Sequence, residues 1–319
     1  MPSRCTQGQR FRIETRGLRC KPEYIEANGL ISNEMRGSPG LAGVQYVIAR
    51  KIRFGRWVAA ALSFAVLAFV CWSFAVGKID WRMVGRYMFE PDIVAGMLNT
   101  IILATCAMVS GVILGLVAAL MLSSGNPVLR TASRSYIFVF RSVPIMLQLL
   151  IWYNLALVFP TLGIAGFGSV KTTEVITPFV AALLAFGIAQ GAYTSEVIRS
   201  GLLAVGQGQF EAASSLGMTQ LQMLRRIVIP QAMRIVVPPL GNEMIGMVKY
   251  TSLASIIQYR DIIYGAQSIY YANGRVIELL IVCTLWYTAV VALLSLAQDR
   301  VEKHYNKGSR NIRQLGVAQ

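Results

Sequence analysis

The sequence is poor in the side chains on which most soluble enzymes depend. Among 319 residues there is one histidine, His304, and there are five cysteines, none of which forms a CxxC pair. A histidine-ligated metal site or a histidine-based catalytic triad therefore cannot be built within one chain. No GxxxxGK[ST] phosphate-binding loop is present either. These absences argue against most enzyme classes, and we expect no catalytic residue, metal site or cofactor in this chain.

Charged residues are also scarce, at 14% of the chain against 55% hydrophobic residues. This balance is typical of a membrane protein. The charges that remain are mostly basic, with 30 Lys and Arg against 15 Asp and Glu. Basic residues beside apolar spans mark cytoplasmic loops more often than nucleic-acid sites, so we expect no nucleic-acid partner.

Six stretches are apolar over roughly the 20 residues that a helix needs to cross a bilayer. An arrangement with both termini in the cytoplasm puts most basic residues on the cytoplasmic side, in agreement with the positive-inside rule. The sequence therefore predicts an all-α membrane protein with six transmembrane helices and cytoplasmic N- and C-termini. The predicted spans are residues 57–77, 97–122, 136–159, 177–198, 239–257 and 276–298.

The two ends of the chain are predicted to lie outside the transporting part. Residues 1–56 are basic and lack apolar periodicity, which predicts a disordered cytoplasmic tail. A second hypothesis is that translation starts at Met35. Residues 57–77 are predicted to be an additional transmembrane anchor, because the stretch is too long for a signal-peptide core. Residues 299–319 are predicted to form a second cytoplasmic tail.

Between the fourth and fifth spans lies a polar segment, "EAASSLGMTQLQMLRRIVIP", at residues 211–230. Gly217 suits the left-handed position after a helix, and Thr219 with Gln222 matches a capping box at the start of a new helix. We predict a helix, a glycine break and a second helix, which ends near Pro230 or re-enters the membrane beyond it. One interpretation is that this segment is a docking site for another protein. The alternative is an amphipathic helix packed on its own bundle or on lipid headgroups.

The spacing of Glu211-Ala212-Ala213, three residues, Gly217, nine residues, Ile227, one residue and Ile229-Pro230 resembles the cytoplasmic signature of importer permeases in the ATP-binding-cassette (ABC) family. Ile229 departs from the leucine that usually precedes the proline. Tyr250 departs from the small or acidic residue that is usual before Thr-Ser-Leu. Further stretches similar to the polar amino-acid branch lie at residues 140–153, 191–201, 206–217 and 230–253.

The resemblance covers most of residues 96–298 and implies a five-helix type-1 permease domain with a cytoplasmic coupling loop at 199–235. It implies a bacterial inner-membrane permease that imports a polar amino acid or close derivative. The partners it implies are a cytoplasmic ABC ATPase dimer that binds Mg-ATP, a second permease subunit of the same or a paralogous chain, and a periplasmic amino-acid-binding protein. The ATPase-docking residues would be Glu211, Ala212, Ala213, Leu216 and Gly217.

Several polar side chains lie inside the predicted spans. Such groups raise the free energy of a membrane-embedded helix unless they are paired or face water. We expect Glu196 to pair with Arg199 three residues on, and Lys249 to pair with Glu243 or Glu196 rather than contact substrate. Arg141 either extends to the membrane surface or has a functional role. The candidates for the translocation path or for intramembrane polar contacts are Gln190, Tyr193, Thr194, Glu196, Lys249, Thr251, Ser252 and Arg141.

Three of these candidates, Gln190, Tyr193 and Thr194, share one helix face, and bonding between helices is the commoner use of such groups. Three prolines are expected to interrupt or bound helices: Pro144, Pro238 and Pro239. The resulting kinks would either line a cavity or only change the direction of the helices.

Two other functions remain open at this point. An ion-coupled secondary transporter would use Glu243, Glu196 and Lys249 as a titratable relay. A membrane scaffold would also explain a protein-docking loop, but it would move no solute.

Overall fold

The computed structural model describes residues 10–11, 25–26, 54–163 and 169–305, in two compact units, Met1–Gly77 and Lys78–Gln319. In the first unit, β1 (Arg10–Phe11) pairs antiparallel with β2 (Ile25–Glu26), and α1 spans Phe54–Val76. The side chains described from Val58 onward in α1 are exposed, which suits a helix surrounded by lipid. The rest of the predicted tail, including Met35, lies outside the described residues.

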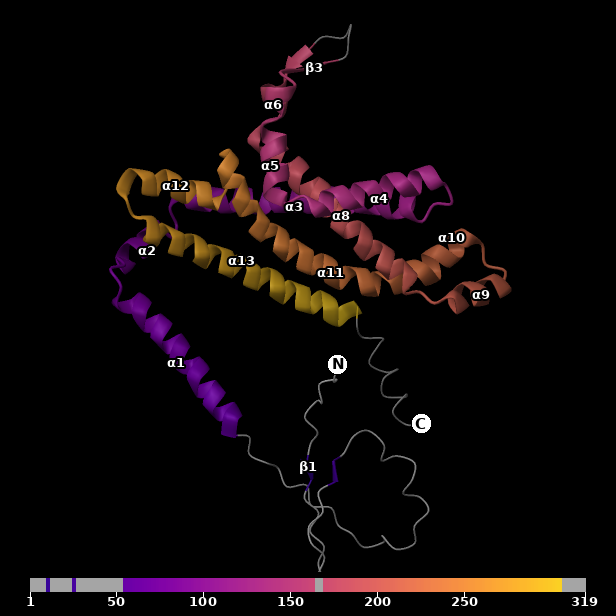
Figure 1. Cartoon of the computed structure of the whole chain (residues 1–319), viewed down its shortest axis with the longest axis horizontal. Coiled ribbons are helices and arrows are strands. Elements are labelled where there is room, and N and C mark those ends of the chain that lie inside the picture. The colour runs from indigo at the N-terminus through magenta and orange to yellow at the C-terminus, as the bar shows by residue number, and fades with distance from the viewer. Residues whose placement is uncertain (1–9, 12–24, 27–53, 164–168, 306–319) are drawn as a thin grey trace, which may run out of the picture. The chain divides into compact units, whose positions relative to one another are not determined.

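The second unit is built from long helices joined by short ones (Figure 1). Its elements are α2 (Trp81–Tyr87), α3 (Pro91–Leu122), α4 (Pro127–Ser142), α5 (Ile145–Tyr153), α6 (Leu155–Val158), β3 (Thr161–Gly163), β4 (Ser169–Lys171), α7 (Thr172–Val175), α8 (Pro178–Leu203), α9 (Gln207–Ser215), α10 (Gln220–Met223), the π-helical turn η1 (Leu224–Val228), α11 (Ile229–Tyr250), the 3-10 helix η2 (Thr251–Ile257), α12 (Ile262–Asn273) and α13 (Val276–Tyr305). Strands β3 and β4 form an antiparallel hairpin.

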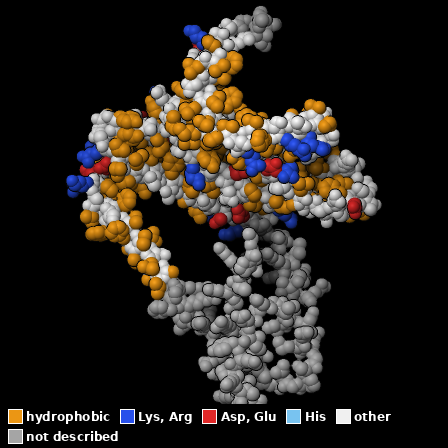
Figure 2. Space-filling view, in the orientation of Figure 1, with side chains coloured by type: hydrophobic (Ala, Val, Ile, Leu, Met, Phe, Trp, Pro, Cys, Tyr) orange, Lys and Arg blue, Asp and Glu red, His pale blue; other side chains and the backbone are white. Residues whose placement is uncertain are grey.

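The predicted all-α membrane fold is confirmed. Among the described residues, α1, α3, α8 and α13 are each long and apolar enough to cross a membrane, and α4 with α5 makes a fifth span if that bent pair is counted as one. Figure 2 shows apolar side chains over most of the visible face of the second unit, as lipid contact requires. The count of six spans is not reached, because α11, which contains Glu243 and Lys249, is not among these helices.

Three predicted spans differ in their bounds from the observed helices. The stretch 136–159 is not one helix, because α4 and α5 meet at a bend of 99°. Pro144 has no N–H to continue the helix and forces the preceding Val143 into an extended conformation. The stretch 239–257 is only the end of a longer helix, α11, followed by η2. The last helix, α13, also continues beyond the predicted span, to Tyr305.

Small residues bring α3 and α8 into close contact at the centre of the bundle. Ala104 and Ala107 of α3 are buried together with Ala181 and Ala185 of α8. A Cβ added at Gly111 of α3 would lie 2.5 Å from the Gln190 side chain. Without a hydrophobic driving force in lipid, this close approach is what holds transmembrane helices together. It also sets the position of the polar face of α8.

A second close contact joins α3 to α12 and can be tested. A Cβ at Gly96 would lie 2.6 Å from the carbonyl oxygen of Asp261, and backbone cannot move aside as a side chain can. We expect Gly96→Ala to lower the thermal unfolding midpoint of the purified protein, since overpacking costs about 1–3 kcal/mol. Gly85→Ala in α2 is the matched control, because nothing lies within 4 Å of that added carbon. Equal midpoints for the two variants would contradict the contact.

Candidate functional site

The polar loop between α8 and α11 has the predicted helix, glycine break and second helix. Helix α9 ends at Ser215, and Gly217 has a φ of 69°, in the left-handed region. The Met218 amide donates to the Ala213 carbonyl (3.1 Å) and the Gly217 amide to the Ser214 carbonyl (2.9 Å), which is the Schellman pattern. The capping box is formed in both directions between Thr219 and Gln222.

The second helix of the loop does not end at Pro230. Helix α10 continues through the π-helical turn η1 directly into α11, and Pro230 lies in the first turn of α11. Pro230 has no N–H to bond to the preceding turn, and the π-helical turn η1 immediately before it changes the hydrogen-bond pattern of the helix at that point. The loop is therefore continuous with a long helix of the bundle, and α9 and α10 lie at one end of that bundle (Figure 1).

The predicted docking residues divide into two groups. Ala213 is buried in a small core with Val205, Met223 and Val228, so it holds α9 to its own bundle and is not available to a partner. This corrects its prediction as a docking residue. The other four predicted docking residues are exposed: Glu211, Ala212, Leu216 and Gly217. Leu216 is 80% exposed. We define these four residues as the loop surface.

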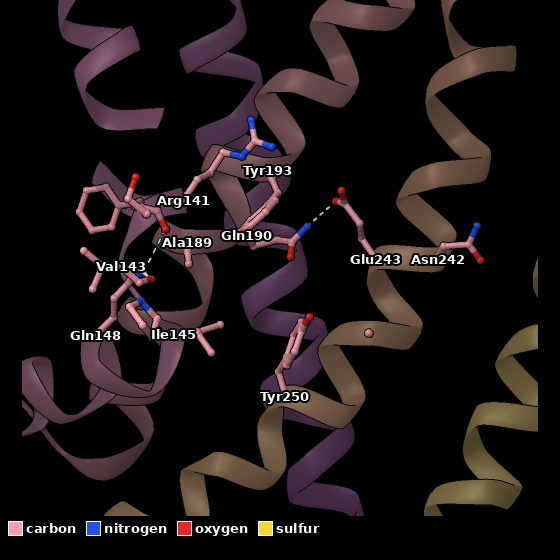
Figure 3. A pocket seen from close by; sticks show the side chains of 14 residues that line it. Arg141, Val143, Ile145, Gln148, Ala189, Gln190, Tyr193, Asn242, Glu243 and Tyr250 are labelled. Atoms are coloured by element: carbon pink, nitrogen blue, oxygen red, sulfur yellow. Dashed lines mark hydrogen bonds between the residues drawn. The ribbon is translucent and has the colours of Figure 1, made fainter. Parts of the chain in front are cut away.

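A pocket of about 460 Å³ lies between α4, α5, α8 and α11 (Figure 3). This volume is in the range of small-molecule sites. The break between α4 and α5 forms one wall, and α8 and α11 form the others. The lining residues are Phe140, Arg141, Ser142, Val143, Pro144, Ile145, Gln148, Ala189, Gln190, Tyr193, Asn242, Glu243, Gly246 and Tyr250.

The wall at the helix break is held by Gln148. Its side-chain amide donates to the carbonyls of Phe140 (3.0 Å) and Val143 (2.9 Å), which the break removes from the regular helix ladder. The buried side-chain oxygen of Gln148 has no hydrogen-bond partner among the described residues. Pro144 thus lines a cavity, which was one of the two roles expected for it.

Arg141 reaches the pocket from the end of α4. Its guanidinium carbon lies 5.2 Å from the centre of the Tyr193 ring, a cation–π contact. None of the ion pairs in the described part of the chain includes Arg141. Its planar N–H donors therefore remain available to a ligand. Arg141 thus lines the pocket, and its functional role stays a prediction.

Glu243 faces the same pocket from α11. Its Oε2 accepts hydrogen bonds from the Gln190 side chain and from the Thr194 hydroxyl (3.2 Å), both on α8 (Figure 3 shows the first). Both bonds go to one oxygen, so Oε1 is left for another donor. Gln190 and Thr194 are therefore used between helices, as expected, and they orient a carboxylate toward the cavity.

The other candidate residues lie outside the pocket. Glu196 pairs with Arg199 at 2.7 Å, as expected. Lys249 is exposed and is paired with neither Glu243 nor Glu196, so that prediction was wrong. The hydroxyls of Thr251 and Ser252 donate to backbone carbonyls within one turn, which satisfies them locally.

Sequence reasoning missed Gln148, Asn242 and Tyr250 as pocket residues. A signal was present for two of them. Asn242, Gly246 and Tyr250 recur at spacings of four residues, and Glu243 lies three residues before Gly246 and seven before Tyr250, which puts all four near one face of α11. Gln148 had no comparable signal, because its place depends on the bend.

The family described as "Binding-protein-dependent transport system inner membrane component" matches residues 111–307. The arginine transport system permease protein ArgU of Corynebacterium glutamicum is 36% identical over 283 residues, covering 87% of this chain and 89% of the relative. The L-cystine transport system permease protein TcyB of Bacillus subtilis is 34% identical, covering 72% and 92%.

Solved structures agree with this result. The structure of an amino acid ABC transporter with histidines is 32% identical, has a TM-score of 0.62, and covers 72% of this chain and all of that one. An inward-facing MetNI methionine ABC transporter is 19% identical with a TM-score of 0.52, covers 68% of this chain and 97% of that one, and supports the fold alone.

Both kinds of comparison confirm the resemblance to ABC importer permeases and identify an integral, multi-pass membrane protein rather than an enzyme. The chain belongs to the family of inner membrane components of binding-protein-dependent transport systems.

Proposed function

We propose that the chain is the permease subunit of an ATP-driven importer for a polar amino acid or close derivative, acting in the inner membrane of a bacterium. Relatives named for arginine and L-cystine transport support an amino acid as the substrate class. The pocket between α4, α5, α8 and α11 is the proposed place where the substrate binds during passage.

One observation carries the substrate assignment. Among the residues that the structure describes, the pocket presents a guanidinium without an acidic partner, on Arg141, and a carboxylate oxygen without a donor, on Glu243. Every amino acid carries one carboxylate and one ammonium group at its α-carbon. A guanidinium binds a carboxylate through two parallel N–H donors, and a carboxylate accepts from an ammonium. A pocket for a neutral sugar would not need opposite charges.

The loop surface is the proposed contact with the motor. A separate ATPase dimer would seat Glu211, Ala212, Leu216 and Gly217 in a groove, and a second permease subunit and an extracytoplasmic binding protein would complete the importer. ATP, bound with magnesium on that partner, shifts the permease between inward-open and outward-open states only if it interacts differently with the two. The continuity of the loop with α11 lets movement at the loop reach Glu243 in the pocket.

The test is uptake by the purified permease, reconstituted in liposomes with its ATPase and binding protein, with a panel of labelled L-amino acids and a neutral sugar. We expect ATP-dependent uptake of at least one polar amino acid and none of the sugar. Uptake that follows an ion gradient and ignores ATP would contradict the proposal and support a secondary transporter.

Glu243→Gln is expected to raise the KM for uptake by about 10- to 100-fold, because a hydrogen bond to a charged group contributes about 1.5–3 kcal/mol. The amide keeps an oxygen for Gln190 and Thr194, so the helix contact should survive. Glu174→Gln on α7 is the matched control, since Glu174 is exposed and outside the pocket. An unchanged KM in Glu243→Gln would remove this carboxylate from the binding site.

A further inference from the structure

Asp261 is a buried carboxyl group that the proposed transport cycle does not use. It caps α12, its side chain is fully buried, and its Oδ1 accepts from the Tyr264 amide (2.9 Å). Its Oδ2 has no hydrogen-bond partner among the described residues. The hydroxyl of Tyr287 on α13 is buried and without a partner in the same way. Two buried polar atoms of one junction are thus unsatisfied, which is costly for a charged group.

Helix α3 forms hydrogen bonds to the residues on both sides of Asp261. The Asn99 side chain donates to the carbonyl of Arg260 (2.8 Å), and the Ile262 amide donates to the Thr100 hydroxyl (3.4 Å). Backbone meets backbone at Gly96, whose added Cβ would lie 2.6 Å from the Asp261 carbonyl oxygen. The carboxyl group therefore lies inside a tight contact, which cannot widen without separating α12 from α3.

No cation in the described part of the chain offsets a charge on Asp261. The ionisable groups that act on it or are acted on by it are Tyr259, Cys283 and Tyr287, all neutral in their ordinary form. Its neighbour Arg260 is exposed and makes no ion pair with it. Burial raises the pKa of Asp261 from 3.8 to about 7, and the backbone hydrogen bonds at the start of α12 offset only part of that rise.

We propose that Asp261 is a proton-sensitive contact residue. It stabilises the packing of α12 against α3 while it is protonated and weakens that packing when it ionises. The protonated carboxyl leaves no net charge inside the junction and has an O–H to donate. The ionised form leaves an unpaired charge in a space closed by α3, α12 and α13. Helix η2 connects the pocket residue Tyr250 to this junction. Ionisation of Asp261 therefore also affects one wall of the pocket.

The direction of the pH effect follows from proton linkage. In the unfolded chain the carboxyl loses its proton near pH 4, whereas in the folded chain it keeps the proton until about pH 7. Between these values the folded state binds more protons, so stability falls as the pH rises through this window. Above about pH 7 both states are ionised and the fall from this group ends.

The experiment is the thermal unfolding midpoint of the purified full-length protein from about pH 5 to about pH 8. We expect the wild-type midpoint to fall by several degrees up to about pH 7 and then level, and Asp261→Asn to lack this fall. The amide of Asp261→Asn keeps an acceptor for the Tyr264 amide and does not titrate. Asp92→Asn is the matched control, because Asp92 is exposed on α3 and should leave the wild-type fall in place.

A second variant keeps the test decisive if Asp261→Asn does not fold. Asp261→Ser also caps a helix and does not titrate, so it should show the same flat profile. A wild-type fall that persists in whichever of these variants folds would overturn the proposal. The outcome is independent of the proposed function, since the readout is stability and requires no transport.

Discussion

Gly217→Asp is expected to abolish ATP-driven uptake while the protein remains inserted in the membrane. Nothing lies within 4 Å of a Cβ at this position, and aspartate tolerates the left-handed conformation better than most residues, so the loop should still fold. The new carboxylate would lie on the loop surface, beside Leu216. Burying an unpaired charge against the ATPase costs about 3–5 kcal/mol, which corresponds to at least about a 100-fold loss of docking.

Uptake, co-purification of the ATPase and membrane content of the permease should be measured together for this variant. Glu211→Lys reverses a charge on the same surface and should give the same result. Gly125→Asp, in the turn between α3 and α4, is the matched control, because it introduces the same charge at another open glycine. Normal uptake by Gly217→Asp and Glu211→Lys at normal expression would remove the loop surface from the coupling mechanism.

Arg141→Ala is expected to raise the KM for uptake by at least about 30-fold. Removing one member of a hydrogen-bonded charge pair costs about 2–5 kcal/mol, and here the substrate carboxylate would lose its partner. Arg141→Lys should recover only part of the affinity, because an ammonium keeps the charge but not the planar pair of donors. The Tyr193 ring loses its cation in the alanine variant but keeps it in the lysine variant.

The control for this prediction is Arg134→Ala, which removes an exposed arginine from the same helix outside the pocket. Measuring KM and the maximal rate separately distinguishes lost binding from lost coupling. A loss confined to the maximal rate in Arg141→Ala would assign Arg141 to the conformational cycle. An unchanged KM would remove it from substrate binding.

The two largest predicted effects concern two separate segments, since Gly217 precedes the continuous segment α10–η1–α11 and Arg141 lies at the end of α4. The loop surface precedes α11, and α11 carries Glu243 opposite Arg141. A defect at Gly217 should therefore spare the affinity for substrate and reduce the rate, whereas a defect at Arg141 should do the reverse. The contrast between these variants tests whether binding and coupling are separable in this protein.

Local signals explain why the loop could be predicted from the sequence. The left-handed Gly217 and the capping box at Thr219 and Gln222 depend on residues within one helical turn of each other, and each stabilises a helix end by itself. The pair of Glu196 and Arg199 is local in the same sense. The exposure of Leu216 and the burial of Ala213 were not predictable, because they depend on where α9 packs against the bundle.

The failed predictions share a different cause. The stretch 136–159 is apolar throughout most of its length, and hydropathy alone does not register the 99° bend at Pro144. Lys249 was expected to pair because a charge in a span usually finds a partner, yet Glu243 is held by Gln190 and Thr194 of α8. Glu243 and Lys249 lie six residues apart in α11, a spacing that puts them on different sides of the helix, and Glu196 is paired with Arg199 of α8.

The sequence by itself determined the membrane class, the approximate place of most spans, the capped polar loop and the permease family, because hydropathy, capping and motif spacing are properties of contiguous residues. Only the tertiary structure decided that Arg141 and Glu243 face one cavity, that Gln148 closes the break beside them, and that Asp261 is enclosed between α3, α12 and α13. These arrangements depend on helix bends, rotations and close backbone contacts at glycine. They are set by packing between segments that are far apart in the chain.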